Sequence, residues 1–343
     1  MAKLKQVAER AGVSPATVSR VLSGAPSVTP PYRERVLRAA MELDYRPNRL
    51  ASNLRRQKSA TIGVVVSDIE NPHFTEMVRT VEAAAFGRGF RVLLCNTDET
   101  VEKQRAYLEV LAEEQVAGVI LVPSDPDGEG IARLLTMGVP LVAFDRMLAD
   151  PRADAAIIAN VGGARRATEY LLAAGHERIG FVGGRVDIQT GAERLAGYES
   201  AMAARGLRPR SAAGAFRIEG GLAATEALLS EDGAITALVV ANNLMTIGAL
   251  RALRARGLRV PNDVGLVAID DPFWAELVDP PLTTLAQLVQ RMAESAVELL
   301  FERITGGDRN QTQTKCLVFS FELRRRGSCG TVGLPQGMAE TSR

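Results

Sequence analysis

The sequence has few of the residues and apolar runs that mark secreted, membrane or disulfide-stabilised proteins. Only three cysteines occur in 343 residues, and their odd number and wide spacing support neither a disulfide framework nor a zinc cluster. No window approaches the roughly 18 uninterrupted apolar residues that a membrane span needs. The first residues also lack the apolar stretch of a secretion signal. We therefore expect a cytoplasmic chain with no membrane partner.

The sequence also lacks the short motifs of common enzymes. It contains no GxSxG, HExxH or GxGxxG, and no GxxxxGK followed by Ser or Thr. The turn after the first predicted strand reads SDIENPHF and has no glycine to admit a pyrophosphate. Of the two histidines, His73 is predicted at the rim of a cleft and His176 in a structural hydrogen bond. We expect no enzymatic activity, no metal and no cofactor.

Positive charge is concentrated at the N-terminal end. Residues 1–60 hold twelve Lys/Arg and four Asp/Glu, a formal charge of +8, whereas the remaining residues hold 29 Lys/Arg and 36 Asp/Glu, or −7. A small basic module before a larger acidic body predicts a polyanion as the partner of the basic part. A basic disordered tail is the alternative, and the regular apolar spacing within the segment argues against it.

The basic segment has the apolar periodicity of three short helices. Gly12 and Gly24 follow the first two as helix stops, and Ser14 and Pro15 suit the N-cap and first position of the second helix. Two helices joined by a tight turn and packed on a third form the helix-turn-helix arrangement, whose second helix enters the major groove of duplex DNA. The residues predicted to face DNA are Ser14, Pro15, Ala16, Thr17, Ser19 and Arg20.

These side chains match different parts of a duplex. Arg20 suits a guanine edge and Ala16 a thymine methyl, whereas Thr17 and Ser19 suit phosphates. A solvated helix surface is the alternative for each of them, and for Thr17 a bond to its own backbone.

From Thr61 the chain alternates short apolar runs with longer helical periods, such as 76–88, 102–114 and 164–174. This alternation predicts an α/β protein with parallel sheets covered by helices on both faces. These runs are too many for the strands of one compact sheet, so we predict two doubly wound subdomains. The predicted strands are Ile62–Val66, Val92–Cys95, Val119–Val122, Leu141–Phe144, Ala155–Ile158, Ile179–Val182, Ala237–Ala241, Leu266–Ile269 and Leu317–Phe321.

Polar side chains follow many of these runs, where open parallel sheets bind ligands beyond the carboxyl ends of their strands. Carboxylates, amides and arginines near aromatic rings suit a polyhydroxylated ligand such as a sugar. For any one residue, a helix cap, a turn or a surface ion pair is the alternative. The candidate residues in the predicted first lobe are Asp68, Asn71, Phe74, Asn96, Asp98, Ser124, Asp125, Asp145 and Arg146. Those in the predicted second lobe are Asp187, Arg194, Asn242, Asn243, Asp270, Phe273 and Trp274.

Several segments resemble one family of proteins along nearly the whole chain. KQVAERAGVSPATVSRVLSG near the start, and NPHF, GHERIGFVGG, RLAGY, PNDVGLVAIDD and PPLTTL further on, are similar to motifs of the lactose/galactose repressor (LacI/GalR) family of bacterial transcription regulators. The resemblance implies a helix-turn-helix headpiece over 1–46, a hinge over 47–60 and a two-lobed, periplasmic-binding-protein-like domain over 61–327. The lobes would comprise 61–158 plus 288–316, and 159–287 plus 317–327, with a flexible tail over 328–343.

The resemblance also implies roles for individual residues. In the hinge, Leu54 would enter the minor groove, with Asn48, Asn53 and Arg55 beside it; a flexible linker is the alternative. Among the pocket candidates, Arg194, Asn242 and Asp270 match effector contacts most firmly. Phe74, Arg146 and Trp274 match the next best, and the match of Asp68, Asn71 and Gln287 to effector contacts is weaker.

We expect a homodimer, because the C-terminal segment has no leucine heptad for a tetramer. The first helix of the body has an apolar face at Met77, Val78, Val81 and Ala85, which suits either the partner subunit or the core of its own lobe.

The expected function is a nucleoid-associated repressor that binds operator DNA and responds to a small molecule, most simply a sugar or sugar derivative. Two alternatives remain open at this point. One is a repressor that needs a purine-type corepressor, and the other is a solute-binding protein without DNA binding.

Overall fold

The computed structural model describes residues 4–22, 28–45, 59–230, 235–306 and 313–330. The chain divides into two units, one extending to Ser59 and the other starting at Ala60. We call the first unit the headpiece and the second the body. No helix among the described residues has the length and apolar character needed to cross a membrane.

The headpiece contains three short helices, α1 (Leu4–Ala11), α2 (Pro15–Leu22) and α3 (Pro30–Glu42). Gly12 has a φ of 63°, the left-handed conformation in which a glycine ends a helix at little cost. Ser14 caps α2 as predicted, because its Oγ accepts a hydrogen bond from the Thr17 N–H at 3.2 Å. The small core comprises Val7, Ala8, Ala11, Val18, Val21, Val36, Ala39 and Ala40. The predicted helix-turn-helix is confirmed.

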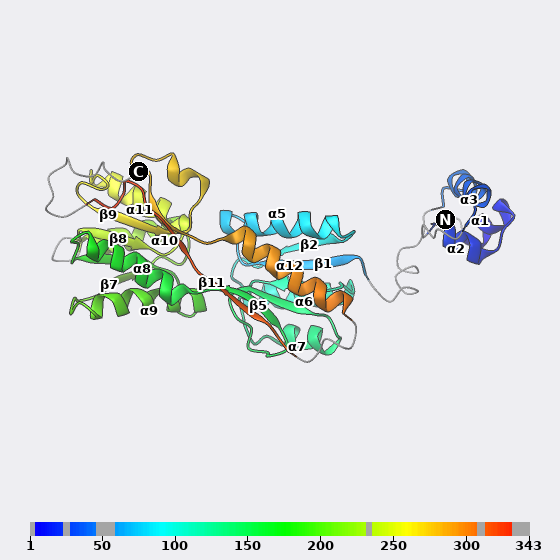
Figure 1. Ribbon diagram of the computed structural model, residues 1–343, viewed down its shortest axis with the longest axis horizontal. Coiled ribbons are helices and arrows are strands. Elements are labelled where there is room, and N and C mark those ends of the chain that lie inside the picture. Colours follow the sequence, from blue (N-terminus) through cyan, green and yellow to red (C-terminus); the bar gives the residue numbers. More distant parts are fainter. Residues whose placement is uncertain (1–3, 23–27, 46–58, 231–234, 307–312, 331–343) are drawn as a thin grey trace. The chain divides into compact units, whose positions relative to one another are not determined.

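The body is built from two six-stranded sheets, each belonging to one lobe (Figure 1). The first lobe has the strand order β11-β5-β4-β3-β1-β2, and the second β12-β10-β9-β8-β6-β7. Every described strand pair is parallel except β10 with β12. The predicted pair of doubly wound α/β subdomains is therefore confirmed, with one antiparallel edge strand added.

The bounds of the elements follow the chain from lobe to lobe. The first lobe contains β1 (Thr61–Val66), α5 (Pro72–Gly87), β2 (Arg91–Asn96), α6 (Val101–Glu113), β3 (Val119–Leu121), α7 (Glu129–Thr136), β4 (Leu141–Asp145), β5 (Asp154–Ile158), α12 (Val289–Thr305) and β11 (Cys316–Phe319). The second contains α8 (Asn160–Ala173), β6 (Ile179–Gly183), α9 (Gln189–Ala203), β7 (Arg210–Ala213), α10 (Ile218–Ser230), β8 (Ala237–Val240), α11 (Asn243–Ala255), β9 (Gly265–Ile269), the 3₁₀ helix η1 (Phe273–Glu276), β10 (Thr283–Ala286) and β12 (Glu322–Arg324).

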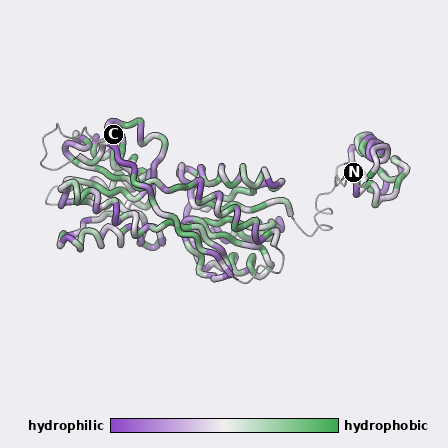
Figure 2. The backbone as a smooth tube through the Cα atoms, in the orientation of Figure 1, coloured by the Kyte–Doolittle hydropathy of each residue, from purple (hydrophilic) through white to green (hydrophobic). Residues whose placement is uncertain are grey.

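Helices cover both faces of each sheet and bury its strands. In the first lobe α5 packs against α12, while α6 packs against α7; in the second, α8 pairs with α9 and α10 with α11. All residues of β3, β4, β8 and β9 are buried, as expected for parallel strands covered on both sides. Figure 2 shows hydrophobic segments in the interior of both lobes. Met77, Val81 and Ala85 of α5 are buried in the core of their own lobe.

The structure corrects the predicted return of the chain to the second lobe. The run Leu317–Phe321 was expected as one strand of the second lobe, but Leu317–Phe319 pair with β5 in the first sheet. Only after this strand does the chain cross over, and Glu322–Arg324 then pair with β10. The predicted run therefore supplies a strand of the first sheet, and the residues just after it form the edge strand of the second. Strands β7 and β10 were not predicted, because RSAA and TTLA have no long apolar run.

The predicted flexible tail begins too early at residue 328. Ser328 and Cys329 are buried, and the Ser328 hydroxyl donates to the Leu266 carbonyl at 2.6 Å while accepting from the Thr283 N–H at 2.8 Å. The Cys329 carbonyl lies 2.9 Å from Nε2 of His176, which confirms the predicted structural hydrogen bond of that histidine. Residues 331–343 lie outside the described residues.

This packing predicts unequal reactivity of the thiols. Burial raises the pKa of the Cys329 thiol to about 11, and the thiolate is the reactive form, whereas Cys316 is exposed. At pH 8, a disulfide reagent with mass-spectrometric mapping should modify Cys316 rapidly and Cys329 at least about a hundredfold more slowly.

Cys316→Ser is the control and should remove the fast phase. Comparable rates at Cys316 and Cys329 would show that residues 328–330 do not pack as described.

Candidate functional site

The predicted DNA-facing residues lie on one exposed region of the headpiece. Ser14, Pro15, Ala16 and Arg20 are exposed, and Thr17 and Ser19 are partly exposed, whereas Val18 and Val21 of the same helix point into the core. The hydroxyls of Ser14 and Thr17 lie 2.9 Å apart and hydrogen-bond to each other. Local capping therefore engages these two hydroxyls, while the rest of the surface remains accessible.

The four predicted hinge residues lie outside the described residues. Asn48, Asn53, Leu54 and Arg55 fall within 46–58, so their assignment stays a prediction.

The body contains a pocket lined by both lobes at the carboxyl ends of their strands. Its volume is about 460 Å³, including the space at its open mouth. The first lobe contributes Asp68, Asn71, His73, Phe74, Glu99, Asp145 and Arg146. The second contributes Thr190, Arg194, Ala215, Phe216, Arg217, Asn242, Asp270 and Gln287.

Strand ends account for much of this lining. Asp68 follows β1, Arg146 follows β4, Asn242 follows β8 and Asp270 follows β9. Parallel strands present their carboxyl ends at one edge of a sheet, and the two sheets direct those edges toward the same pocket. Of the nine residues that the family resemblance matched to effector contacts, eight line it: Asp68, Asn71, Phe74, Arg146, Arg194, Asn242, Asp270 and Gln287.

Trp274 is the predicted residue that the structure does not bring to the pocket. It lies in η1 and packs against the hydrophobic core. The aromatic residue that lines the pocket from this lobe is Phe216, in the loop between β7 and α10. Because β7 was not predicted, no strand end drew attention to this loop.

Hydrogen bonds within the second lobe hold the three residues predicted most firmly. Arg194 donates from Nε to Asn160 Oδ1 at 2.8 Å and from Nη1 to the Ala241 carbonyl at 2.6 Å. Asn242 caps α11 by accepting from the Met245 N–H. Their side chains are buried, so these contacts fix where polar atoms meet the pocket.

Asp270 is held in the same way. Its φ of 75° is unusual for a residue other than glycine, and its carboxylate accepts from the side chains of Asn243 at 3.0 Å and Gln287 at 2.6 Å. The backbone N–H of Asn243 adds a third bond. The carboxylate is therefore fixed at the end of β9.

Polar contacts also join the two lobes beside the pocket. Asn243 of the second lobe donates to Asn71 of the first at 2.8 Å. Arg217 lies 3.2 Å from the Asp68 carboxylate across the same boundary. A ligand that changes the relative position of the lobes must change these contacts.

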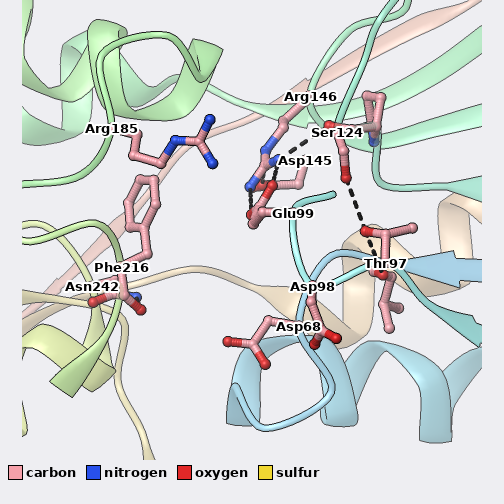
Figure 3. Close-up of polar contacts among 12 residues, drawn as sticks. Asp68, Thr97, Asp98, Glu99, Ser124, Asp145, Arg146, Arg185, Phe216 and Asn242 are labelled. Atoms are coloured by element: carbon pink, nitrogen blue, oxygen red, sulfur yellow. Dashed lines mark hydrogen bonds and ion pairs between the residues drawn. The ribbon is translucent and has the colours of Figure 1, made fainter. Parts of the chain in front are cut away.

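Burial raises the pKa of Asp68, although the Glu70 N–H and Arg217 partly oppose the shift. Figure 3 shows Asp68 near Asp98 on the first-lobe side of the pocket. This carboxylate ionises less readily than one in water and depends on the cation from the opposite lobe.

Several lining residues were missed or misplaced in the sequence. His73 was predicted at the rim but is buried, with its ring 4.9 Å from Phe74 and 6.1 Å from Phe144 between centroids. Glu99 immediately follows Asp98, a residue that was noted, yet only Glu99 lines the pocket. Asn96 instead donates to Asp98, and Ser124 bonds Thr97. Asp187 pairs with Arg185.

Two family models match the chain. The model described as bacterial regulatory proteins, lacI family, matches residues 3–48, and the one described as periplasmic binding protein-like domain matches residues 168–329. The first match lies in the helix-turn-helix unit, and the second lies within the two-lobed body.

Full-length relatives share both parts. The transcriptional regulator CelR of Thermobifida fusca is 38% identical over 335 residues, covering 95% of this chain and 97% of the relative. The transcriptional repressor PurR of Haemophilus influenzae (strain PittEE) is 33% identical over 338 residues, covering 97% of this chain and all of the relative.

Solved structures of similar proteins cover both the headpiece and the body of this chain. The lac repressor dimer bound to operator and the anti-inducer ONPF superposes with a TM-score of 0.82 at 29% identity, covering 96% of this chain and 99% of that one. The CelR–cellobiose complex gives a TM-score of 0.70 at 34% identity, covering 96% and 100%. A solute-binding protein without a DNA-binding unit, one of the two alternatives left open by the sequence, is therefore excluded. The chain belongs to the LacI family of bacterial DNA-binding transcription regulators, which are not enzymes.

Proposed function

We propose that this chain is a homodimeric, nucleoid-associated repressor whose affinity for operator DNA is set by a sugar or sugar derivative in the pocket between the lobes. The observation that carries the proposal is the pocket itself, which is lined from both lobes and contains ordered carboxylate, amide and guanidinium groups. Its polar side chains are held by their own hydrogen bonds. Such preorganised groups recognise hydroxyls in defined directions.

The aromatic rings support a sugar as the ligand. Phe74 and Phe216 line the pocket from opposite lobes, and aromatic faces pack against the apolar C–H faces of sugar rings while polar groups bind the hydroxyls. The similar CelR structure holds cellobiose. The chain is also similar to the PurR repressor. A purine-type corepressor is therefore the second candidate ligand.

The proposed mechanism is a shift between two arrangements of the lobes. A ligand changes DNA affinity only by binding one arrangement better than the other. Asn71 with Asn243, and Asp68 with Arg217, join the lobes beside the pocket, so ligand contacts at these places would favour one arrangement. The hinge residues Asn48, Asn53, Leu54 and Arg55 would transmit the difference to DNA as a proposed wedge in the minor groove.

DNA binding by the full chain tests this function directly. Selection from random duplexes should yield a near-palindromic site, because a symmetric dimer presents two equivalent headpieces. Its binding should weaken steeply with salt. Glucose, galactose, ribose, cellobiose, hypoxanthine and guanine are then titrated into the complex while fluorescence anisotropy is recorded. Release or tightening by a sugar supports the proposal, whereas a response only to purines favours the second candidate.

Leu54→Ala should lower affinity for the selected operator about a hundredfold and change affinity for unrelated duplex by less than about threefold. An apolar wedge contributes only where the duplex opens to receive it. Anisotropy titrations on both DNAs measure the two losses. Met41→Ala removes an exposed apolar side chain of α3 and is the matched control. Equal losses on both DNAs for Leu54→Ala would contradict the wedge.

Arg194→Gln should abolish the response to the effector while leaving operator affinity within about threefold of wild type. The guanidinium lies in the pocket of the body, so it contributes to ligand binding and not to DNA contact. Arg165→Gln, an exposed substitution on α8, should leave both properties unchanged. Circular dichroism checks that both variants fold. Release of DNA by Arg194→Gln at the wild-type effector concentration would contradict the assignment of Arg194 to effector binding.

A further inference from the structure

A largely buried ion pair lies inside the pocket on the first-lobe side. Arg146 donates from Nη2 to Glu99 Oε1 at 2.6 Å and from Nη1 to Glu99 Oε2 at 2.7 Å, a bidentate arrangement (Figure 3). Nη1 also donates to the Pro123 carbonyl at 3.1 Å. The side chains of Arg146 and Glu99 are only 6% and 15% exposed. The end of this guanidinium that would grip a ligand's carboxylate or phosphate is therefore already occupied.

The loop that carries Glu99 has an uncommon backbone. Asp98 and Glu99 have φ values of 50° and 57°, so two consecutive residues other than glycine adopt the left-handed conformation. The Glu99 N–H donates to the Ser67 carbonyl at 3.1 Å, which fixes the loop against the end of β1. Strained conformations persist where the surrounding structure over-determines them, and they gather at functional sites. The loop holds the Glu99 carboxylate against Arg146.

Next to the pair, two buried atoms have no hydrogen-bond partner among the described residues. They are Oδ1 of Asp145 and Nε of Arg146, and this Nε lies in an ion pair 3.6 Å from the other Asp145 oxygen, Oδ2, beyond hydrogen-bond distance. Both residues line the pocket and are only 5% exposed. Buried polar atoms of folded proteins are nearly always partnered, so each exception calls for an explanation. A ligand hydroxyl supplies what both lack, because it donates to a carboxylate and accepts from a guanidinium N–H.

The charges that line the pocket do not favour an anion. Four carboxylates (Asp68, Glu99, Asp145 and Asp270) and three guanidinium groups (Arg146, Arg194 and Arg217) line it, a formal charge of −1. Arg217 is paired with Asp68. Arg185, which approaches the pocket from the second lobe in Figure 3, is paired with Asp187. An anion placed beside Asp145 would meet a like charge in a poorly solvated place, which is costly.

We propose that Glu99, by occupying Arg146 beside Asp145, makes the pocket select uncharged sugars and reject their carboxylated or phosphorylated counterparts. This inference rests on the sugar-binding function proposed above and names the ligand's charge class. The selection works by exclusion. Glu99 occupies the two terminal nitrogens of Arg146, and the Asp145 carboxylate repels an anionic group of the ligand. Ligand hydroxyls satisfy Asp145 Oδ1 and Arg146 Nε.

Matched pairs of ligands that differ in charge test the proposal on the full-length wild-type protein. The pairs are glucose with glucuronate, galactose with galacturonate, ribose with ribose 5-phosphate, and cellobiose with cellobionate, each measured by isothermal titration calorimetry. Within any pair that binds, the neutral member should bind at least about tenfold more tightly. Equal or tighter binding of the charged member would overturn the inference and leave the sugar-binding function intact.

Glu99→Gln locates the cause. The variant keeps the shape of the side chain but no longer neutralises the charge of Arg146. The preference for the neutral member of each pair should therefore fall at least about tenfold. Glu102→Gln, an exposed substitution three residues later on α6, removes the same charge and should leave the preference unchanged. Glu99→Gln/Arg146→Gln removes both charges of the pair and should restore the preference. An unchanged preference in Glu99→Gln, or an equal loss in the double variant, would overturn the proposal.

Two further outcomes have defined meanings. If Glu99→Gln does not fold, the wild-type pairs alone decide, because the predicted preference belongs to the native pocket. If none of the sugars, neutral or charged, binds or alters operator affinity, the sugar-binding function fails and the inference falls with it. Binding confined to charged sugars overturns the inference alone.

Discussion

The meeting of two parallel sheet edges at one pocket is the constraint on which the rest of the body depends. Each sheet presents the carboxyl ends of its strands there, and the loops that follow those ends carry most of the polar lining. Helices on both faces bury the strands and hold the edges in place. The chain crosses between the lobes three times along its described length, so neither lobe is one continuous segment. A change in the position of one lobe must therefore move the connections to the other.

The pocket combines order within each lobe with contacts between lobes. Arg194 and Asp270 are fixed by partners of their own lobe, whereas Asn243 and Arg217 reach across to Asn71 and Asp68. The first kind of contact orients groups for a ligand before it arrives. The second kind is what a ligand can strengthen or break, and it provides the differential binding that allosteric control requires.

Charge pairs in this pocket are better explained by selectivity than by stability. Burying an ion pair removes two charges from water, and the attraction gained often does no more than offset that loss. The pair of Glu99 with Arg146 is largely buried and bidentate, and Glu99 lies on a loop with an uncommon conformation. Two neighbouring atoms, Asp145 Oδ1 and Arg146 Nε, still have no hydrogen-bond partner in the part of the chain that the structure describes. This arrangement has a clear use if it decides which ligands enter.

Local patterns in the sequence determined the element types, the helix-turn-helix and much of the pocket. Period-3.6 and continuous apolar runs predicted the helices and buried strands, and the rule that ligands meet strand ends marked Asp68, Arg146, Asn242 and Asp270 without tertiary knowledge. The family resemblance raised Arg194 and Phe74 above other polar and aromatic residues. The tertiary structure alone decided that Glu99 faces Arg146, that Phe216 and not Trp274 lines the pocket, and that 317–319 and 322–324 join different sheets. These outcomes depend on which strands become neighbours, and contacts between residues far apart in the chain leave no periodic trace in the sequence.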